Sequence, residues 1–191
     1  IPQMELEGYE ADDIIATLTH SAKDQNVRVV VVSGDKDLHQ LVEDPRIVQW
    51  DPQRDRWIAE KDVLERFGVT SRQFRDFLAL MGDSSDNVPG VKGVGEKSAQ
   101  QLIKQWHSLE GIYESLDRIT PQSVQRKLRD HRDAAFLSRD LVTLKHDAPV
   151  STVLEDLVPS PPARPERLRF CEELGFRSLS DTLAKSWGED P

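Results

Sequence analysis

The sequence predicts an α/β protein, with a mostly parallel sheet flanked by helices and a helical C-terminal part. Two observations support this fold class. Residues 27–32 form an apolar run broken only by Arg28 and followed by Ser33-Gly34-Asp35, which is typical of a buried parallel strand that enters a loop and a short helix. Most of the remaining chain repeats apolar residues at helical spacing, as in Ile14, Ile15 and Leu18.

Turn residues and apolar spacing place the other elements. A first helix is expected from Tyr9, and the Asp51-Pro52-Gln53-Arg54-Asp55 segment predicts the turn of a short hairpin. Prolines between 149 and 165 predict a linker or extended arm, and helical periodicity returns from Glu166 to Trp187. The hairpin strands are expected at 47–51 and 56–59, and further helices at 60–67, 71–81, 97–106, 109–116, from Pro121 onward and at 134–144.

Composition limits the classes of function. No apolar run reaches membrane-spanning length, no signal peptide is visible, and the single Cys171 excludes a disulfide framework. The formal net charge of −9 argues against a nucleic-acid partner. However, if seven of the 34 acids hold metal ions, the remaining 34 − 7 = 27 acids nearly balance the 25 bases.

Three clusters of acids lie at the edges of expected elements. Asp83 and Asp86 are three residues apart, so both carboxylates share a face if the preceding helix continues through them. Solvated loops and ordinary helix caps are the alternative interpretation of such clusters. Taken together, the three acid clusters suggest a site for hard divalent cations, and two such ions would make a phosphodiesterase site. The clusters are Glu10/Asp12/Asp13, Asp35/Asp37 and Asp83/Asp86.

A glycine-rich segment directly follows the third cluster. Gly90, Gly93 and Gly95 interrupt regular structure just before a helix that begins near Glu96. Free N–H groups at a helix start favour an anion, and Lys92 and Lys97 add positive charge there. Ordinary turn chemistry is again the alternative, but the pairing with an acidic cluster suggests an enzyme that cuts nucleic acid.

Three motifs occur in the order known from the 5′-nuclease (flap endonuclease-like) family, which the sequence resembles over nearly all its length. They are Gly8-Tyr9-Glu10-Ala11-Asp12-Asp13, the segment 33–41 (SGDKDLHQL) and the segment 80–99 (LMGDSSDNVPGVKGVGEKSA). The likeness is greatest to the 5′→3′ exonuclease domain of bacterial DNA polymerase I. It implies structure-specific cleavage of DNA at 5′ flaps, nicks or RNA primer ends, in primer removal and repair.

The resemblance also implies roles for particular residues. Residues 88–97 match the family's helix–three-turn–helix, which holds duplex DNA by its phosphates. The implied ligands of two Mg²⁺ or Mn²⁺ ions are Glu10, Asp12, Asp13, Asp35, Asp37, Asp83 and Asp86. The implied DNA contacts are Lys92, Gly93, Val94, Gly95, Lys97 and Ser98. A K⁺ ion is implied on the main-chain carbonyls of Leu80, Met81, Pro89, Val91 and Val94.

The same resemblance gives the expected organisation. Residues 1–82 would be the C-terminal part of the nuclease core, 83–148 the DNA-binding helical region, 149–165 the linker and 166–191 a tail leading to the next domain. The family's first strand and basic arch would precede Ile1, so we expect these 191 residues alone to cleave DNA weakly. A monomer joined to a polymerase in the bacterial cytoplasm, near the nucleoid, is expected. A free-standing 5′ nuclease and a non-catalytic, structure-specific DNA-binding module are the alternatives.

Overall fold

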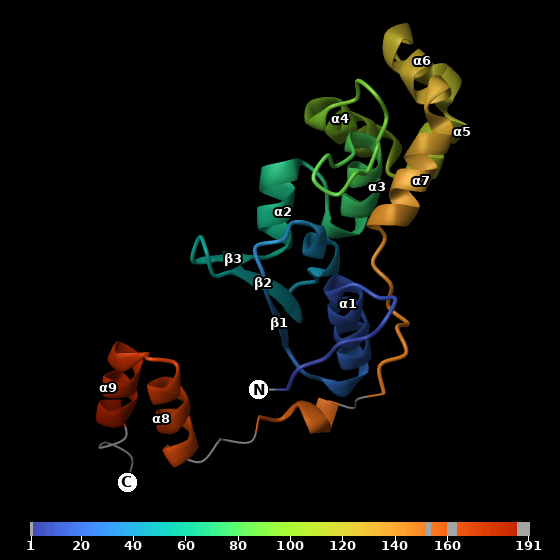
Figure 1. The fold of residues 1–191 in the computed structure, drawn as a ribbon. Coiled ribbons are helices and arrows are strands. Elements are labelled where there is room, and N and C mark those ends of the chain that lie inside the picture. Colours follow the sequence, from blue (N-terminus) through green and yellow to red (C-terminus); the bar gives the residue numbers. More distant parts are fainter. Residues whose placement is uncertain (1, 152–153, 160–163, 187–191) are drawn as a thin grey trace. The chain divides into compact units, whose positions relative to one another are not determined.

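The computed structural model describes residues 2–151, 154–159 and 164–186. They fall into two compact units, one spanning Met4–Ser151 and the other combining residues 1–3 with 152–191. Figure 1 shows the order of the elements along the chain. Every predicted site residue belongs to the unit Met4–Ser151, whereas Trp187, the predicted end of the tail, lies outside the described residues.

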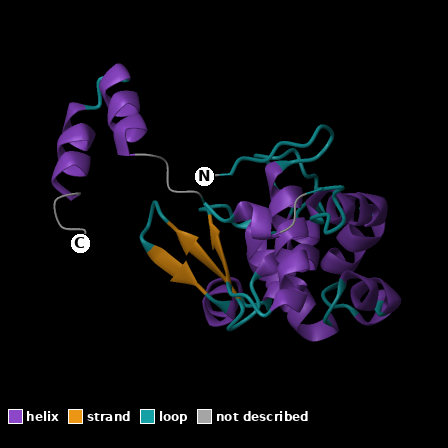
Figure 2. Ribbon diagram, turned by 90° about the horizontal axis from the view of Figure 1, so that it is seen from below, coloured by secondary structure: helices purple, strands orange, loops and turns teal. Residues whose placement is uncertain are grey.

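A three-stranded sheet of order β1-β2-β3 forms one side of this unit (Figure 2). β1 (Val29–Val32) pairs in parallel with β2 (Ile47–Asp51), with Val29 opposite Ile47. β2 pairs antiparallel with β3 (Arg56–Ile58), with Trp50 opposite Trp57. The predicted parallel strand and the predicted hairpin are therefore both present, and the α/β class is confirmed.

The prediction that the first strand is buried is wrong for one of its two faces. Val31 is 5% exposed and packs against Ala16, Leu38 and Ile47, but Val32 is 57% exposed. Successive side chains of a strand point to opposite faces, so an apolar run alone does not show that both faces are covered.

Helices make up most of the unit. α2 and α3 begin and end where the sequence predicts, but the expected helix at 109–116 divides at Ser115 into α5 and a 3₁₀ turn. The helices are α1 (Ala11–Ala22), α2 (Glu60–Phe67), α3 (Ser71–Met81), α4 (Glu96–Trp106), α5 (Leu109–Glu114), α6 (Gln122–Asp130) and α7 (Arg132–Val142). The 3₁₀ turns are η1 (Lys23–Gln25), η2 (Asp37–Leu41) and η3 (Leu116–Arg118).

The packing of α3 explains where the site forms. Phe74, Phe77 and Leu80 are fully buried in a core that α3 shares with α4 and α7. η2, which follows β1, contacts both α1 and α3. The segment after β1 therefore lies close to the start of α1 and the end of α3, and all three bear predicted site acids.

The second unit contains a helical hairpin. The described elements are η4 (Leu154–Leu157), α8 (Arg164–Glu173) and α9 (Arg177–Ser186), and α8 packs against α9. Gly175, with φ +71°, turns the chain between them, and the Phe176 N–H donates to the Cys171 carbonyl at 2.8 Å. In the part of the chain that the structure describes, no helix has the length and apolar character needed to cross a membrane.

Candidate functional site

The first acid cluster caps α1. Glu10 is the N-cap residue of α1, and Asp13 Oδ2 accepts from the Glu10 N–H at 3.4 Å. Asp13 Oδ1 accepts the Lys145 N–H at 2.9 Å, which ties α1 to the segment after α7. Asp12 is half-buried, and burial, followed by the charge of Asp35, raises the pKa of its carboxyl.

The second cluster lies on the loop between β1 and η2. The Ser33 hydroxyl accepts the Asp35 N–H at 3.0 Å, and Asp35 Oδ1 accepts the Asp37 N–H at 2.9 Å. Gln49 Nε2 on β2 donates to the Asp35 carbonyl at 2.7 Å and fixes the loop from below. This network holds the two acids side by side on a rigid support.

Asp37 has a buried carboxyl group in an unfavourable environment for its charged form. Its Oδ1 atom is buried and has no hydrogen-bond partner among the described residues. Burial raises the pKa of this carboxyl to about 6, against the opposing charge of Lys36 and with the help of the charges of Asp35, Asp83 and Asp86. An acceptor in this state is suited to a cation.

The third cluster lies on a turn rather than on a helix, so the predicted helical face for Asp83 and Asp86 is wrong. α3 ends at Met81 because Gly82 adopts φ +74°. The Asp83 N–H donates to the Val88 carbonyl at 3.0 Å and the Val88 N–H to the Asp83 carbonyl at 2.7 Å. The turn between them exposes Asp86 and leaves Asp83 partly buried.

Lys36 forms an ion pair with Asp83. The hydrogen bond from Lys36, then those from Ser85, hold the pKa of the Asp83 carboxyl at about 2. Lys36 has no predicted role, although it lies between Asp35 and Asp37 in the second acid cluster.

The three clusters interact electrostatically but do not close around one point. The charges of Asp35 and Asp86 act on Asp12, and those of Asp35, Asp83 and Asp86 act on Asp37. Within the described ranges, no three His, Cys, Asp or Glu side chains have an arrangement that could hold a metal ion. The carboxylates therefore share a region, with the Lys36 ammonium among them.

The predicted phosphate seat is a turn held by glycine packing. A Cβ atom on Gly90, whose φ is +61°, would lie 2.5 Å from the Gly82 nitrogen, so the two backbones meet only because both residues are glycine. The Ser138 hydroxyl on α7 accepts the Gly90 N–H at 2.8 Å. α4 follows with Gly95 as its N-cap, as the sequence predicts to within one residue.

Basic side chains surround this turn. Lys92 and Lys97 are exposed, and Lys127 on α6 donates to the Gly93 carbonyl at 2.8 Å. The contact between Lys127 and Gly93 could not be predicted from local sequence, because 34 residues separate them. Of the carbonyls predicted to hold K⁺, that of Leu80 accepts the Val91 N–H and that of Val91 accepts the Val94 N–H, both at 2.9 Å.

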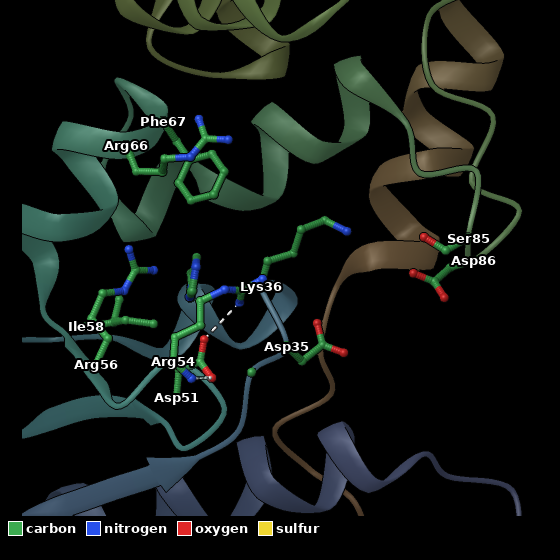
Figure 3. A pocket seen from close by; sticks show the side chains of 12 residues that line it. Asp35, Lys36, Asp51, Arg54, Arg56, Ile58, Arg66, Phe67, Ser85 and Asp86 are labelled. Atoms are coloured by element: carbon green, nitrogen blue, oxygen red, sulfur yellow. Dashed lines mark hydrogen bonds and ion pairs between the residues drawn. The ribbon is translucent and has the colours of Figure 1, made fainter.

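A pocket of ≈ 600 Å³ lies beside the acids (Figure 3). Figure 3 shows Asp35, Ser85 and Asp86 at one side of it, with Arg56 and Arg66 at the other. The sequence predicts the hairpin but not this pocket, because α2 and η2 complete it from other parts of the chain. The lining residues with no predicted role are Gly34, Lys36, His39, Asp51, Arg54, Arg56, Ile58, Arg66, Phe67 and Ser85.

Known proteins share this architecture. A DNA polymerase I from Caldicellulosiruptor bescii is 39% identical over 97% of this chain, and that from Bacillus subtilis strain 168 is 40% identical over 99%. A crystal structure of the bacteriophage T5 flap endonuclease with DNA and metal ions superimposes with a TM-score of 0.67. It is 26% identical and covers 73% of this chain and 51% of the phage protein.

Family models cover most of the chain. The 5′-3′ exonuclease N-terminal resolvase-like domain matches residues 1–68, and the 5′-3′ exonuclease C-terminal SAM fold matches residues 69–165. The chain spans about a fifth (22%) of the length of the two polymerase relatives. On these matches, and on the order of the three acid clusters and the glycine turn, the chain belongs to the 5′-3′ exonuclease family.

Proposed function

We propose that this chain is the nuclease part of a metal-dependent enzyme that hydrolyses phosphodiesters at 5′ flaps, nicks or RNA primer ends in DNA. The observation that carries the proposal is the position of three acid-bearing segments next to an exposed, lysine-flanked glycine turn. The DNA and metal ions named for the T5 relative support it. By the likeness to the DNA polymerase I relatives, we propose that these residues work as part of a longer protein that also carries a polymerase.

The donor set fits divalent cations chemically. It offers only carboxylate oxygens, which Mg²⁺ and Mn²⁺ prefer, and the buried Asp37 Oδ1 lacks a partner in the described residues. We assign Asp12, Asp35, Asp37, Asp83 and Asp86 as the main candidates for ligands. Asp13 already accepts the Glu10 and Lys145 N–H groups, so we propose that Glu10 and Asp13 hold Asp12 in place or act through water.

The chain's own residues would prepare the phosphodiester for attack. When bound, the cations would supply Lewis-acid activation of water and charge stabilisation at phosphorus. The Ser33 and Gln49 hydrogen bonds fix Asp35, so that the reacting groups are held in a defined geometry. A cation on Asp83 would free Lys36, whose ammonium could then contact a phosphate oxygen.

The glycine turn would hold the duplex. Lys92, Lys97 and the free N–H groups at the start of α4 can bind phosphates but offer no base-specific pattern. We also propose K⁺ on the carbonyls of this turn. The second lone pair of the Leu80 and Val91 carbonyls remains available for an ion.

The test compares the chain with its Asp83→Asn/Asp86→Asn variant. Calorimetric titration with Mn²⁺ should show saturable binding that the variant loses, and a 5′-flap substrate with Mg²⁺ should be cut, if weakly, by the unaltered chain and not by the variant. The matched control is Asp130→Asn/Asp147→Asn, two exposed acids outside the site. Equal Mn²⁺ affinity in both variants would remove the proposed metal site. DNA binding with Ca²⁺ but no cleavage with Mg²⁺ would favour a DNA-binding module.

A further inference from the structure

The pocket beside the acids has a basic wall that the proposed chemistry does not use. Arg54 and Arg56 come from the β2–β3 hairpin and Arg66 from α2. Strand alternation explains why Arg56 and Ile58 both line the pocket, whereas Trp57 between them does not. The position of Arg56 in the wall therefore follows from the alternation of side chains along β3.

The three arginines differ in whether they are already paired. Arg54 Nη1 contacts Asp51 Oδ2 at 2.9 Å, and Arg66 Nη1 contacts Glu96 Oε1 at 2.9 Å. Arg56 is exposed, and its side chain has no hydrogen bond or ion pair within the described residues. Its guanidinium is thus free to bind a ligand, with five donors in a planar fork that suits phosphate.

The floor of the pocket combines an imidazole, an aromatic ring and an aliphatic side chain. His39 and Ile58 are buried, and the Phe67 ring packs against His39 with centroids 5.6 Å apart. His39 Nδ1 is hydrogen-bonded to Gln49 Oε1 at 2.8 Å, which fixes the imidazole. Such a floor suits a sugar or base, while the rim suits its phosphate, and ≈ 600 Å³ is ample for one nucleotide.

The opposite rim ends at Asp35 and Asp86, which belong to the acid cluster. A ligand on the arginine wall would therefore lie directly beside the proposed metal site. We infer that this pocket binds one nucleotide of a single nucleic-acid strand, with its phosphate on Arg56. The inference rests on the proposed nuclease function, since it specifies how the strand next to the cut is held.

The test measures binding with Ca²⁺ by fluorescence anisotropy, using the whole chain. One probe is a duplex with a 5′ single-stranded flap and the other a blunt duplex of equal length. Arg56→Gln should weaken flap binding roughly five- to tenfold and lower the salt slope by about 0.7, the value for one phosphate contact on a single strand. Blunt-duplex binding should not change.

Arg28→Gln is the matched control, because Arg28 is exposed at the end of β1 away from Gly34. It should bind both probes like the unaltered chain. Arg56→Lys keeps the charge but not the fork, and should give an intermediate loss while preserving the strand. If Arg56→Gln lowers the melting temperature, the flap affinity of Arg56→Lys is compared with that of the unaltered chain instead, and a selective loss of flap binding in Arg56→Lys supports the inference.

Two further probes distinguish the source of the phosphate. If the loss requires a 5′-phosphate on a one-nucleotide flap, the pocket takes a terminal phosphate. If the loss of affinity persists with a 5′-hydroxyl and a longer flap, the pocket takes an internal phosphodiester. Unchanged flap binding in Arg56→Gln, or equal losses on both duplexes, would overturn the inference. Failure of the unaltered chain to bind any DNA would instead overturn the proposed function.

Discussion

Asp37 illustrates at the residue scale how a binding group can cost stability. Its folded pKa of about 6 lies above the ordinary value of 3.8, so the folded state binds the proton more tightly than the unfolded state. The contribution of Asp37 to the free energy of unfolding is therefore most favourable below about pH 4, and this contribution is lost as the pH rises through about 6. Above that pH the ionised carboxylate destabilises the fold when no cation compensates it.

We therefore expect Asp37→Asn to stabilise the metal-free chain at pH 8. The shift corresponds to no more than about 1–2 kcal/mol once solvent screening is allowed for. Urea unfolding in EDTA at pH 8 and pH 4.5 should show a gain at the higher pH that shrinks at the lower. Asp147→Asn, an exposed acid on a loop, should change neither value. A gain independent of pH would show that ionisation of Asp37 is not its cause.

At the element scale, Ser138 connects α7 to the glycine turn. Its hydroxyl accepts the Gly90 N–H and donates to the Ala134 carbonyl at 2.7 Å. Ser138→Ala would leave a buried N–H without a partner, which costs about 1–3 kcal/mol. Urea unfolding should show this loss, whereas Ser123→Ala on the exposed face of α6 should stay within about 0.5 kcal/mol. A loss below that limit in Ser138→Ala would mean that water replaces the hydroxyl.

Lys97 tests the turn as a seat for phosphate. It is exposed in the first turn of α4, where backbone N–H groups also favour an anion. Lys97→Ala should weaken binding to all duplexes alike and lower the slope of log affinity against log salt by about 0.9. Anisotropy titrations at several salt concentrations, on two duplexes of unrelated sequence, measure both. A change in preference between the duplexes at an unchanged slope would contradict a purely backbone contact.

Local signals account for the elements that the sequence predicts well. α2 is followed by Gly68 at φ +68°, and α3 by Gly82 at φ +74°, so a single glycine determines where each helix ends. The same Gly82 is why the helix does not reach Asp83, which helical spacing alone did not reveal. The acid clusters can be recognised as sequence motifs, but the ion pair between Lys36 and Asp83 depends on the packing of η2 against α3.

The pocket beside the acids could not be predicted from the sequence. Arg56 and Arg66 are ten residues apart, on a strand and a helix whose relative orientation no local signal fixes. Asp35 and Asp86 reach the same pocket from two further segments. The proximity of these arginines and acids results from tertiary packing, so it is known only from the structure.

For the whole molecule, the distribution of charge matters more than its total. A net charge of −9 repels DNA, yet the seven acids of the three clusters gather at the proposed metal site, beside the turn that we propose binds DNA. Without divalent cations these carboxylates should oppose binding, and Lys36 is held by Asp83. With cations the same carboxylates become part of an attractive surface, because each ion adds two positive charges.

This reversal predicts that one substitution will have opposite effects in two media. In EDTA at low salt, Asp83→Asn/Asp86→Asn removes two negative charges and frees Lys36, so duplex affinity should rise about three- to tenfold. In Ca²⁺ the variant loses ligands for the cation, so its affinity should fall below that of the unaltered chain. Anisotropy titrations in the two buffers measure both effects. Asp130→Asn/Asp147→Asn removes the same charge elsewhere and should give a smaller rise in both media. If the site variant also changed affinity in the same direction in both media, the acids would act only as bulk charge, and the proposed cation site would have no part in holding DNA.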